Sequence, residues 1–187
     1  MLVGISGPSC SGKTTLAREI AAFLDAPTLH LDRHFDSKAE RTVVNGHRSY
    51  ERPEQYDGAA LLEETRLALK LNEHVVVEGF ILFSYPGFEQ ACDRMVHLDL
   101  PHHILARRRR QRAEGNDAAG DVKGGRIRDA DAAWAAHGKS EWERFGAFQR
   151  DLRDMTVVSI GEADGRTPRE IALQLLGTWA STPHRHM

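Results

Sequence analysis

Short apolar runs alternate along the chain with longer segments in which apolar residues recur at helical spacing. The runs are bounded by turn residues and predict buried strands, at residues 2–6, 28–32, 74–80, 94–100 and 156–160. The periodic segments predict helices. They cover residues 13–24, 57–71, 101 through the arginine-rich stretch, the segment that follows residue 125 and continues through Trp134 to about Arg153, and 168–179. Strands separated by helices indicate an α/β fold with a parallel sheet, right-handed crossovers and helices on both faces.

Three segments lack such a period. Residues 33–52 are polar and too long for a simple connection, which favours a functional or mobile segment. Residues 114–125, EGNDAAGDVKGG, are small, polar and glycine-rich, and predict the tip of a mobile lid. The last residues, STPHRHM, are expected to be frayed. No internal repeat is visible, and 187 residues suit one α/β domain better than two.

The stretch GPSCSGKTT, residues 7–15, lies between the first predicted strand and the first predicted helix. It matches G-x-x-x-x-G-K-[ST], the phosphate-binding loop. Its glycines permit close backbone approach, and main-chain N–H groups with the helix N-terminus attract an anion. Lys13 would reach the β- and γ-phosphates, and the Thr14 hydroxyl would bind Mg²⁺. The residues expected to hold the nucleotide are Gly7, Ser9, Cys10, Ser11, Gly12, Lys13, Thr14 and Thr15.

This loop predicts a three-layer P-loop NTPase fold, with a five-stranded parallel sheet and a small helical lid. The alternative for the same residues is a plain glycine-rich turn with an exposed lysine. A phosphate loop predicts nucleotide binding but leaves the reaction open, because GTPases, motor ATPases and small-molecule kinases all contain one.

Two carboxylates follow predicted strands at the edge of the sheet where ligands bind. Asp32 comes at the end of the second strand, where it could accept a proton from a substrate hydroxyl beside the γ-phosphate. Glu78 follows Val75, Val76 and Val77 and could hold Mg²⁺ or its water shell. The alternatives are a turn-capping aspartate and a solvent-facing glutamate.

The strongest charge cluster comprises Arg107, Arg108, Arg109, Arg110 and Arg112. Consecutive residues on a helix point around its circumference, so these arginines cannot all serve one site. One or two could stabilise a transferring phosphoryl group, while the others face solvent or pair with acids. A nucleic-acid patch is the rival explanation, but aromatic residues are not interleaved with the arginines.

Composition and charge limit the kinds of binding partner and the cellular location that we expect for this chain. The net charge of −2 argues against a protein that coats nucleic acid or anionic lipid. No apolar run reaches the ~20 residues of a membrane span, and the opening residues lack the pattern of a signal peptide. With only two cysteines, Cys10 and Cys92, a reduced, cytoplasmic protein is expected. The ten histidines show no zinc spacing, so no structural metal is expected.

Several motifs together resemble the uridine kinase-like family of P-loop kinases. They are GxxxxGKTT, a strand ending in LD, PEQYD, VVVEGF, and an arginine-rich helix before a glycine-rich lid. VEGFILFSY (77–85) and RRRRQR are similar to the nicotinamide riboside kinase branch, whereas ERPEQYD (51–57) is nearer to uridine kinases. The resemblance extends, with gaps, over most of residues 2–155.

The resemblance implies ATP- and Mg²⁺-dependent phosphoryl transfer to the 5′-hydroxyl of a riboside, by a monomer or homodimer. It implies that residues 33–56 form an acceptor-binding insertion and that residues 107–128 form the lid region. Asp32 looks like the general base, with Lys13 and the lid residue Arg112 at the phosphates.

The resemblance also implies substrate and metal contacts. Asp57 looks like a carboxylate that grips ribose hydroxyls, although it is also a plausible helix N-cap. Tyr56 is similar to an aromatic residue beside the substrate base, although it could equally belong to the core. Arg109 matches an arginine that contacts ribose, and Glu78, with Thr14, matches the magnesium side of the site.

Some positions depart from the family pattern and leave the acceptor open. Arg33 stands where riboside kinases have a second acid, and His34 and Phe35 replace an aromatic pair of uridine kinases. A non-nucleoside acceptor such as pantothenate, a sugar acid or a sugar phosphate is therefore an alternative. A nucleotide-gated regulatory protein is a further one, although the chain lacks an N-K-x-D run that would read guanine.

Overall fold

The computed structural model describes residues 1–36, 43–44, 46–48, 52–118 and 139–181. Five parallel strands form the central sheet in the order β2-β5-β1-β6-β7. Their bounds are Leu2–Ser6 (β1), Thr28–His30 (β2), Val75–Glu78 (β5), Arg94–Asp99 (β6) and Met155–Ser159 (β7). The predicted five-stranded parallel sheet is confirmed.

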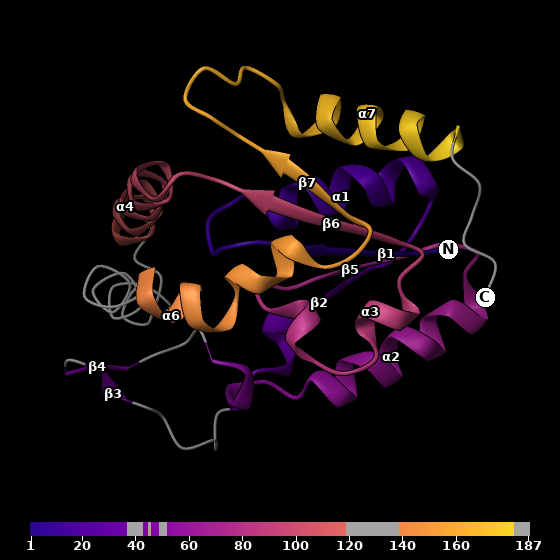
Figure 1. Ribbon diagram of the computed structural model, residues 1–187, viewed down its shortest axis with the longest axis horizontal. Coiled ribbons are helices and arrows are strands. Elements are labelled where there is room, and N and C mark those ends of the chain that lie inside the picture. The colour runs from indigo at the N-terminus through magenta and orange to yellow at the C-terminus, as the bar shows by residue number, and fades with distance from the viewer. Residues whose placement is uncertain (37–42, 45, 49–51, 119–138, 182–187) are drawn as a thin grey trace.

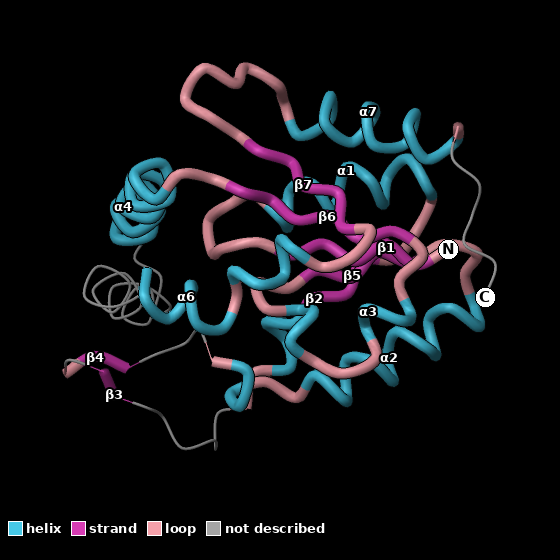
Figure 2. The backbone as a smooth tube through the Cα atoms, viewed as in Figure 1, coloured by secondary structure: helices cyan, strands magenta, loops and turns pink. Residues whose placement is uncertain are grey.

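Helices cover both faces of this sheet, as predicted. Figure 1 shows α1 and α7 on one face and α2 and α3 on the other, and Figure 2 shows the strands as the middle layer. The α-helices are α1 (Lys13–Leu24), α2 (Gly58–Leu71), α3 (Phe88–Ala91), α4 (His102–Ala118), α6 (Lys139–Phe145) and α7 (Pro168–Ala180). A two-stranded antiparallel sheet, β3 (Val43–Val44) with β4 (His47–Arg48), lies in the segment predicted to be aperiodic.

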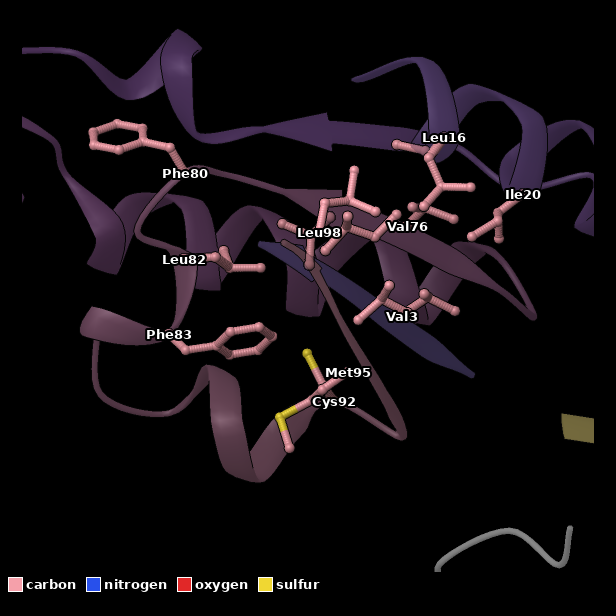
Figure 3. Close-up of a cluster of buried hydrophobic side chains, with 14 of the residues drawn as sticks. Val3, Leu16, Ile20, Val76, Phe80, Leu82, Phe83, Cys92, Met95 and Leu98 are labelled. Atoms are coloured by element: carbon pink, nitrogen blue, oxygen red, sulfur yellow. The ribbon is translucent and has the colours of Figure 1, made fainter. Parts of the chain in front are cut away.

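The apolar runs form the core because strands inside a parallel sheet are covered on both faces. All five residues of β1 and all four of β5 are buried. Figure 3 shows Leu16 and Ile20 of α1 close to Val76 of β5. This packing fixes α1, and therefore the loop before it, against the carboxyl ends of the strands.

Several predicted elements end earlier than expected, among them the strand predicted at 74–80, which spans Val75–Glu78. The second strand stops at His30, where its pairing with β5 also ends at Glu78, and Asp32 lies in a 3-10 turn, Leu31–His34. The helix expected to continue to about Arg153 breaks after Phe145. The ring of Trp142 occupies the space beside Gly146, and a second 3-10 turn, Ala147–Asp151, follows.

Gln149 ties this second 3-10 turn to the segment after β5. Its buried side chain accepts a hydrogen bond from Phe83 N (2.9 Å) and donates to the carbonyls of Phe80 and Gly146 (both 3.0 Å). A buried amide with its hydrogen bonds satisfied specifies one arrangement of the segments that it joins.

The predicted lid tip, 114–125, is only partly described. Its residues 114–118 continue α4, whereas residues 119–138, which include the rest of the lid tip and Trp134 of the helix predicted after it, lie outside the described part, as do the final residues 182–187.

A buried histidine lies below the start of the phosphate loop. His97 of β6 is 2% exposed, stacks on Trp142 with ring centroids 5.9 Å apart, and shares a 2.9 Å hydrogen bond with Ser6 Oγ at the end of β1. The pKa of His97 is lowered to about 4, chiefly by burial; the nearby Lys13 charge acts in the same direction, and Asp99 opposes it. His97 is therefore neutral at pH 7.

We expect His97 to make the fold acid-sensitive. Since its pKa is lower in the folded than in the unfolded chain, the unfolded chain binds more protons as the pH falls below the unfolded pKa. Between pH 7.5 and pH 5 this one group should lower the free energy of unfolding by about 2 kcal/mol. Urea unfolding of wild type and His97→Gln at both pH values measures it. The variant should lose this part of the pH dependence, and equal pH dependence in both proteins would contradict the assignment.

Candidate active site

The loop between β1 and α1 has a backbone that only a few residue types adopt without strain. Gly7, Cys10 and Gly12 have φ values of 140°, 66° and 104°, respectively. A Cβ on Gly7 would lie 2.6 Å from the Leu98 carbonyl oxygen, so a side chain there is excluded by space as well as by conformation. Helix α1 begins at Lys13 without a side-chain cap. Its first N–H groups therefore remain available for an anion.

Most residues of the loop line one small cavity of about 300 Å³. Lys13 is 8% exposed, and its Nζ donates to the Pro8 carbonyl oxygen at 3.0 Å. Thr14 Oγ1 donates to Glu78 Oε1 at 2.9 Å, which joins α1 to the end of β5. Ser11 Oγ is buried and has no hydrogen-bond partner among the residues that the structure describes.

Most of the predicted phosphate-side residues line this cavity together. Its lining residues are Ser9, Cys10, Gly12, Lys13, Thr14, Thr15, Asp32, Glu78, Phe80, Arg108 and Arg112. The predicted residues Gly7, Ser11, Tyr56, Asp57 and Arg109 do not line it. A larger cavity of about 670 Å³ lies between β6, β7 and α7 and contains none of the predicted site residues.

The two carboxylates of the cavity have opposite pKa shifts. Limited hydration raises the pKa of Asp32, and the charge of Glu78 adds to this effect, while Lys13 and Arg112 oppose it. Asp32 keeps an exposed surface because it faces the open cavity, yet protein surrounds its carboxylate closely enough to limit hydration. Burial also raises the pKa of Glu78. The hydrogen bonds from His30 and Thr14 and the positive charge of Lys13 outweigh this effect, so the pKa of Glu78 is lowered overall. Glu78 is thus the firmly ionised member and Asp32 the better proton acceptor.

The arginines of α4 point in different directions, as their consecutive positions predict. Arg108 donates to the carbonyl oxygens of Ser11 (3.0 Å) and Cys10 (3.4 Å), and Arg112 lies 4.0 Å from Cys10 Sγ. These two arginines, one helical turn apart, face the cavity. Arg107 lies 3.9 Å from Glu162 on the outside of the molecule.

Of the residues expected to bind the acceptor, Asp32 lines this cavity, whereas Tyr56, Asp57 and Arg109 do not. The ring of Tyr56 packs edge-on against Phe35 (5.4 Å between centroids) and Phe80 (5.2 Å), and Phe80 itself lines the cavity. Asp57 Oδ1 accepts from Ala60 N at 2.8 Å, which confirms its prediction as the N-cap of α2. Arg109 is 5% exposed, away from the cavity lining.

Sequence reasoning missed three residues of the site. Arg108 was not separated from its neighbours, although its position one turn before Arg112 carries that signal. Phe80 stands in the VEGF motif without having been assigned a role. His30 donates from Nδ1 to Glu78 Oε1 at 2.9 Å, and no motif indicated it.

A fold of this order of strands, with a glycine loop that leads into α1 and a hydroxyl–carboxylate pair behind it, defines a P-loop nucleotide-binding protein. The chain belongs to the AAA domain family, whose model matches residues 3–128. Over all the described residues, none of the helices is long and apolar enough to cross a membrane.

Two nicotinamide riboside kinases are similar to this chain in sequence. The chain is 27% identical over 128 residues to human nicotinamide riboside kinase 1, covering 59% of this chain and 64% of that protein. It is 31% identical over 96 residues to the Schizosaccharomyces pombe nicotinamide riboside kinase, covering 45% of this chain and 42% of that protein. The matches thus span less than two thirds of either relative. They confirm the resemblance to the uridine kinase-like branch.

The fold is also similar to a solved shikimate kinase from Bacteroides thetaiotaomicron. The TM-score is 0.53 at 18% sequence identity, and the match covers 97% of this chain and 99% of the other. At this identity the similarity concerns the fold, and it confirms the predicted P-loop architecture.

Replacing Lys13 tests the phosphate side of the cavity. Lys13→Met keeps an unbranched side chain of nearly the same length but removes the ammonium group and its charge, and a charge-assisted hydrogen bond is worth about 1.5–3 kcal/mol. We expect ATP affinity, measured by isothermal titration calorimetry, to fall roughly 10- to 100-fold. Lys70→Met, at an exposed lysine near the end of α2, is the matched control and should bind ATP like wild type. Equal affinity in all three proteins would place the phosphates elsewhere.

Proposed function

We propose that the protein is an ATP- and Mg²⁺-dependent small-molecule kinase that transfers the γ-phosphoryl group to a hydroxyl of a riboside. The observation that carries the proposal is one cavity that combines the phosphate loop, Lys13 and two carboxylates, Asp32 and Glu78. A phosphate loop alone would serve many reactions, but a carboxylate with a raised pKa beside it suits the removal of a proton from an alcohol. The similarity to nicotinamide riboside kinases supports the same reaction class.

The side chains around the cavity fit a magnesium ion. Thr14 Oγ1 and Glu78 Oε1 lie 2.9 Å apart, and a hydroxyl with one carboxylate, completed by phosphate oxygens and water, is a set of ligands that Mg²⁺ accepts. Among the described residues no cluster of three or more His, Cys, Asp or Glu forms a protein-only metal cage. When bound, the ion would neutralise charge on the β- and γ-phosphates.

The chain's own residues would carry the rest of the reaction by position and charge. Asp32 accepts the proton of the acceptor hydroxyl as that oxygen attacks the γ-phosphorus, while the bond from phosphorus to the bridging oxygen breaks and ADP leaves. Lys13 moves its hydrogen bond from the Pro8 carbonyl to phosphate oxygen, and Arg112 and Arg108 face the transferred group from α4. These three charges act in a confined cavity, where they are screened less than in water.

We further propose that the acceptor lies beside Tyr56, Asp57 and Phe80. The aromatic edge formed by Phe35, Tyr56 and Phe80 offers a surface for a planar base, and the exposed carboxylate of Asp57 can bind ribose hydroxyls in addition to capping α2. Contact of Arg109 with ribose stays a prediction. The division into an acceptor insertion (33–56) and a lid region (107–128) within one kinase domain, in a monomer or homodimer, is part of the same proposal.

The variant Asp32→Asn tests the base. It keeps the shape of the side chain but cannot accept the proton, so kcat should fall about 10²- to 10⁴-fold while ATP affinity stays within about twofold. Because its surroundings raise the pKa of Asp32, the wild-type kcat/KM should fall with decreasing pH from above the range of an ordinary aspartate, and the variant should lack this limb.

Asp25→Asn, at an exposed aspartate after α1, is the control and should match wild type in both respects. Undiminished phosphotransfer by Asp32→Asn would remove Asp32 from the mechanism.

An acceptor panel decides the substrate class. With ATP and Mg²⁺, ADP release should be fastest with a riboside (uridine, cytidine or nicotinamide riboside) because the aromatic edge and Asp57 suit a base and a ribose. Preferential turnover of pantothenate, a sugar acid or a sugar phosphate would favour the alternative kinase. GTP hydrolysis with no phosphorylated product would favour a regulatory P-loop protein.

A further inference from the structure

His30 is the last residue of β2 and stands directly opposite Glu78 in the parallel pairing of β2 with β5. Residues paired in this way carry their side chains on the same face of the sheet, a few ångströms apart. The sheet register itself therefore brings the imidazole to the carboxylate. His30 is half-buried, with 16% of its side chain exposed, and the Glu78 side chain is 6% exposed.

The two hydrogen bonds to Glu78 converge on one oxygen. His30 Nδ1 and Thr14 Oγ1 both donate to Oε1, each at 2.9 Å. An ionised carboxylate can only accept, so Nδ1 of His30 carries the proton of this hydrogen bond. Among the described residues, no hydrogen bond reaches the second oxygen, Oε2. One oxygen is thus anchored by the protein, and the other is left for a ligand.

We propose that His30 is a positioning residue for the divalent cation, which it holds in place indirectly by anchoring Oε1 of Glu78 from the neighbouring strand. The inference rests on the proposed magnesium site at Thr14 and Glu78. With an ion bound, the Thr14 hydroxyl would serve both the ion, through its oxygen, and Glu78, through its O–H, whereas the Nδ1–H of His30 offers the ion no lone pair and would act on Glu78 alone. His30 then keeps the carboxylate from rotating away.

A purely structural role predicts a different pattern. If His30 only filled space at the end of β2, its removal would disturb the cavity as a whole and weaken nucleotide binding with or without metal. If it positions the carboxylate, the loss should be confined to the metal. Partners that orient a metal ligand typically contribute 10- to 100-fold to metal affinity.

The experiment measures Mn²⁺ binding to the full chain with ADP by electron paramagnetic resonance, and ADP binding in EDTA by calorimetry. His30→Ala should weaken Mn²⁺ binding roughly tenfold and leave metal-free ADP affinity within about twofold. His30→Asn carries Nδ2 at the position of Nδ1 and should restore most of the Mn²⁺ affinity. His74→Ala is the matched control, since His74 precedes β5 at the end opposite Glu78 and pairs with Glu73.

Three results would overturn the proposal: wild-type Mn²⁺ affinity in His30→Ala, an equal loss of metal-free ADP binding, or an Asn variant as weak as Ala. A double-mutant cycle adds a further test. In a Glu78→Gln background, His30→Ala should change Mn²⁺ affinity little, and a full additional loss would mean that His30 acts by another route. Failure of the proposed function is separate, because a wild-type protein that phosphorylates no acceptor still gives a readable metal affinity.

Discussion

The turn from β1 into α1 is the constraint on which the site depends. Gly7 and Gly12 have left-handed backbone conformations, and a side chain on Gly7 would collide with the Leu98 carbonyl of the neighbouring strand. This turn directs the N-terminus of α1 toward the cavity, so that Lys13 and Thr14 line the cavity. Cys10 also has a positive φ there, although its side chain makes that backbone conformation less favourable than for glycine. The Arg108 guanidinium, which also lines the cavity, donates to the carbonyl oxygens of Cys10 and Ser11 and so holds the loop to α4.

Opposite shifts of two neighbouring carboxylates follow from how each is surrounded. Glu78 lies at the end of a fully buried strand, but two hydrogen bonds and Lys13 stabilise its charge. Asp32 lies on a 3-10 turn, and no hydrogen bond is among the main causes of its pKa shift. Limited hydration is the largest cause and raises the pKa. Two carboxylates with their pKa values pushed apart can divide the work, one holding a cation and the other exchanging a proton.

The sequence was a good guide wherever a local pattern decided the structure. Apolar runs located all five strands of the main sheet, and the glycine–lysine spacing located the loop, because both patterns encode backbone geometry directly. Asp57 was recognised as a helix cap for the same reason. Strand and helix ends were less predictable. β2 stops where β5 offers no further partner, and the helix before residue 147 stops where Trp142 crowds Gly146. His30 was missed because its role depends on the register between two strands whose paired residues, His30 and Glu78, lie 48 positions apart in the sequence.

The hydrogen bond from Lys13 to the Pro8 carbonyl bears on how the protein divides its free energy between folding and binding. An ammonium group that is already withdrawn from water, with an oxygen of its own loop as partner, has met its dehydration cost when the chain folds. When an anionic ligand binds, the Lys13 ammonium exchanges the Pro8 carbonyl oxygen for a ligand oxygen, and no solvated cation has to be dehydrated. Preorganisation of this kind strengthens binding at the expense of the empty protein, so residue 13 is a position where conformational stability and ligand affinity pull in opposite directions.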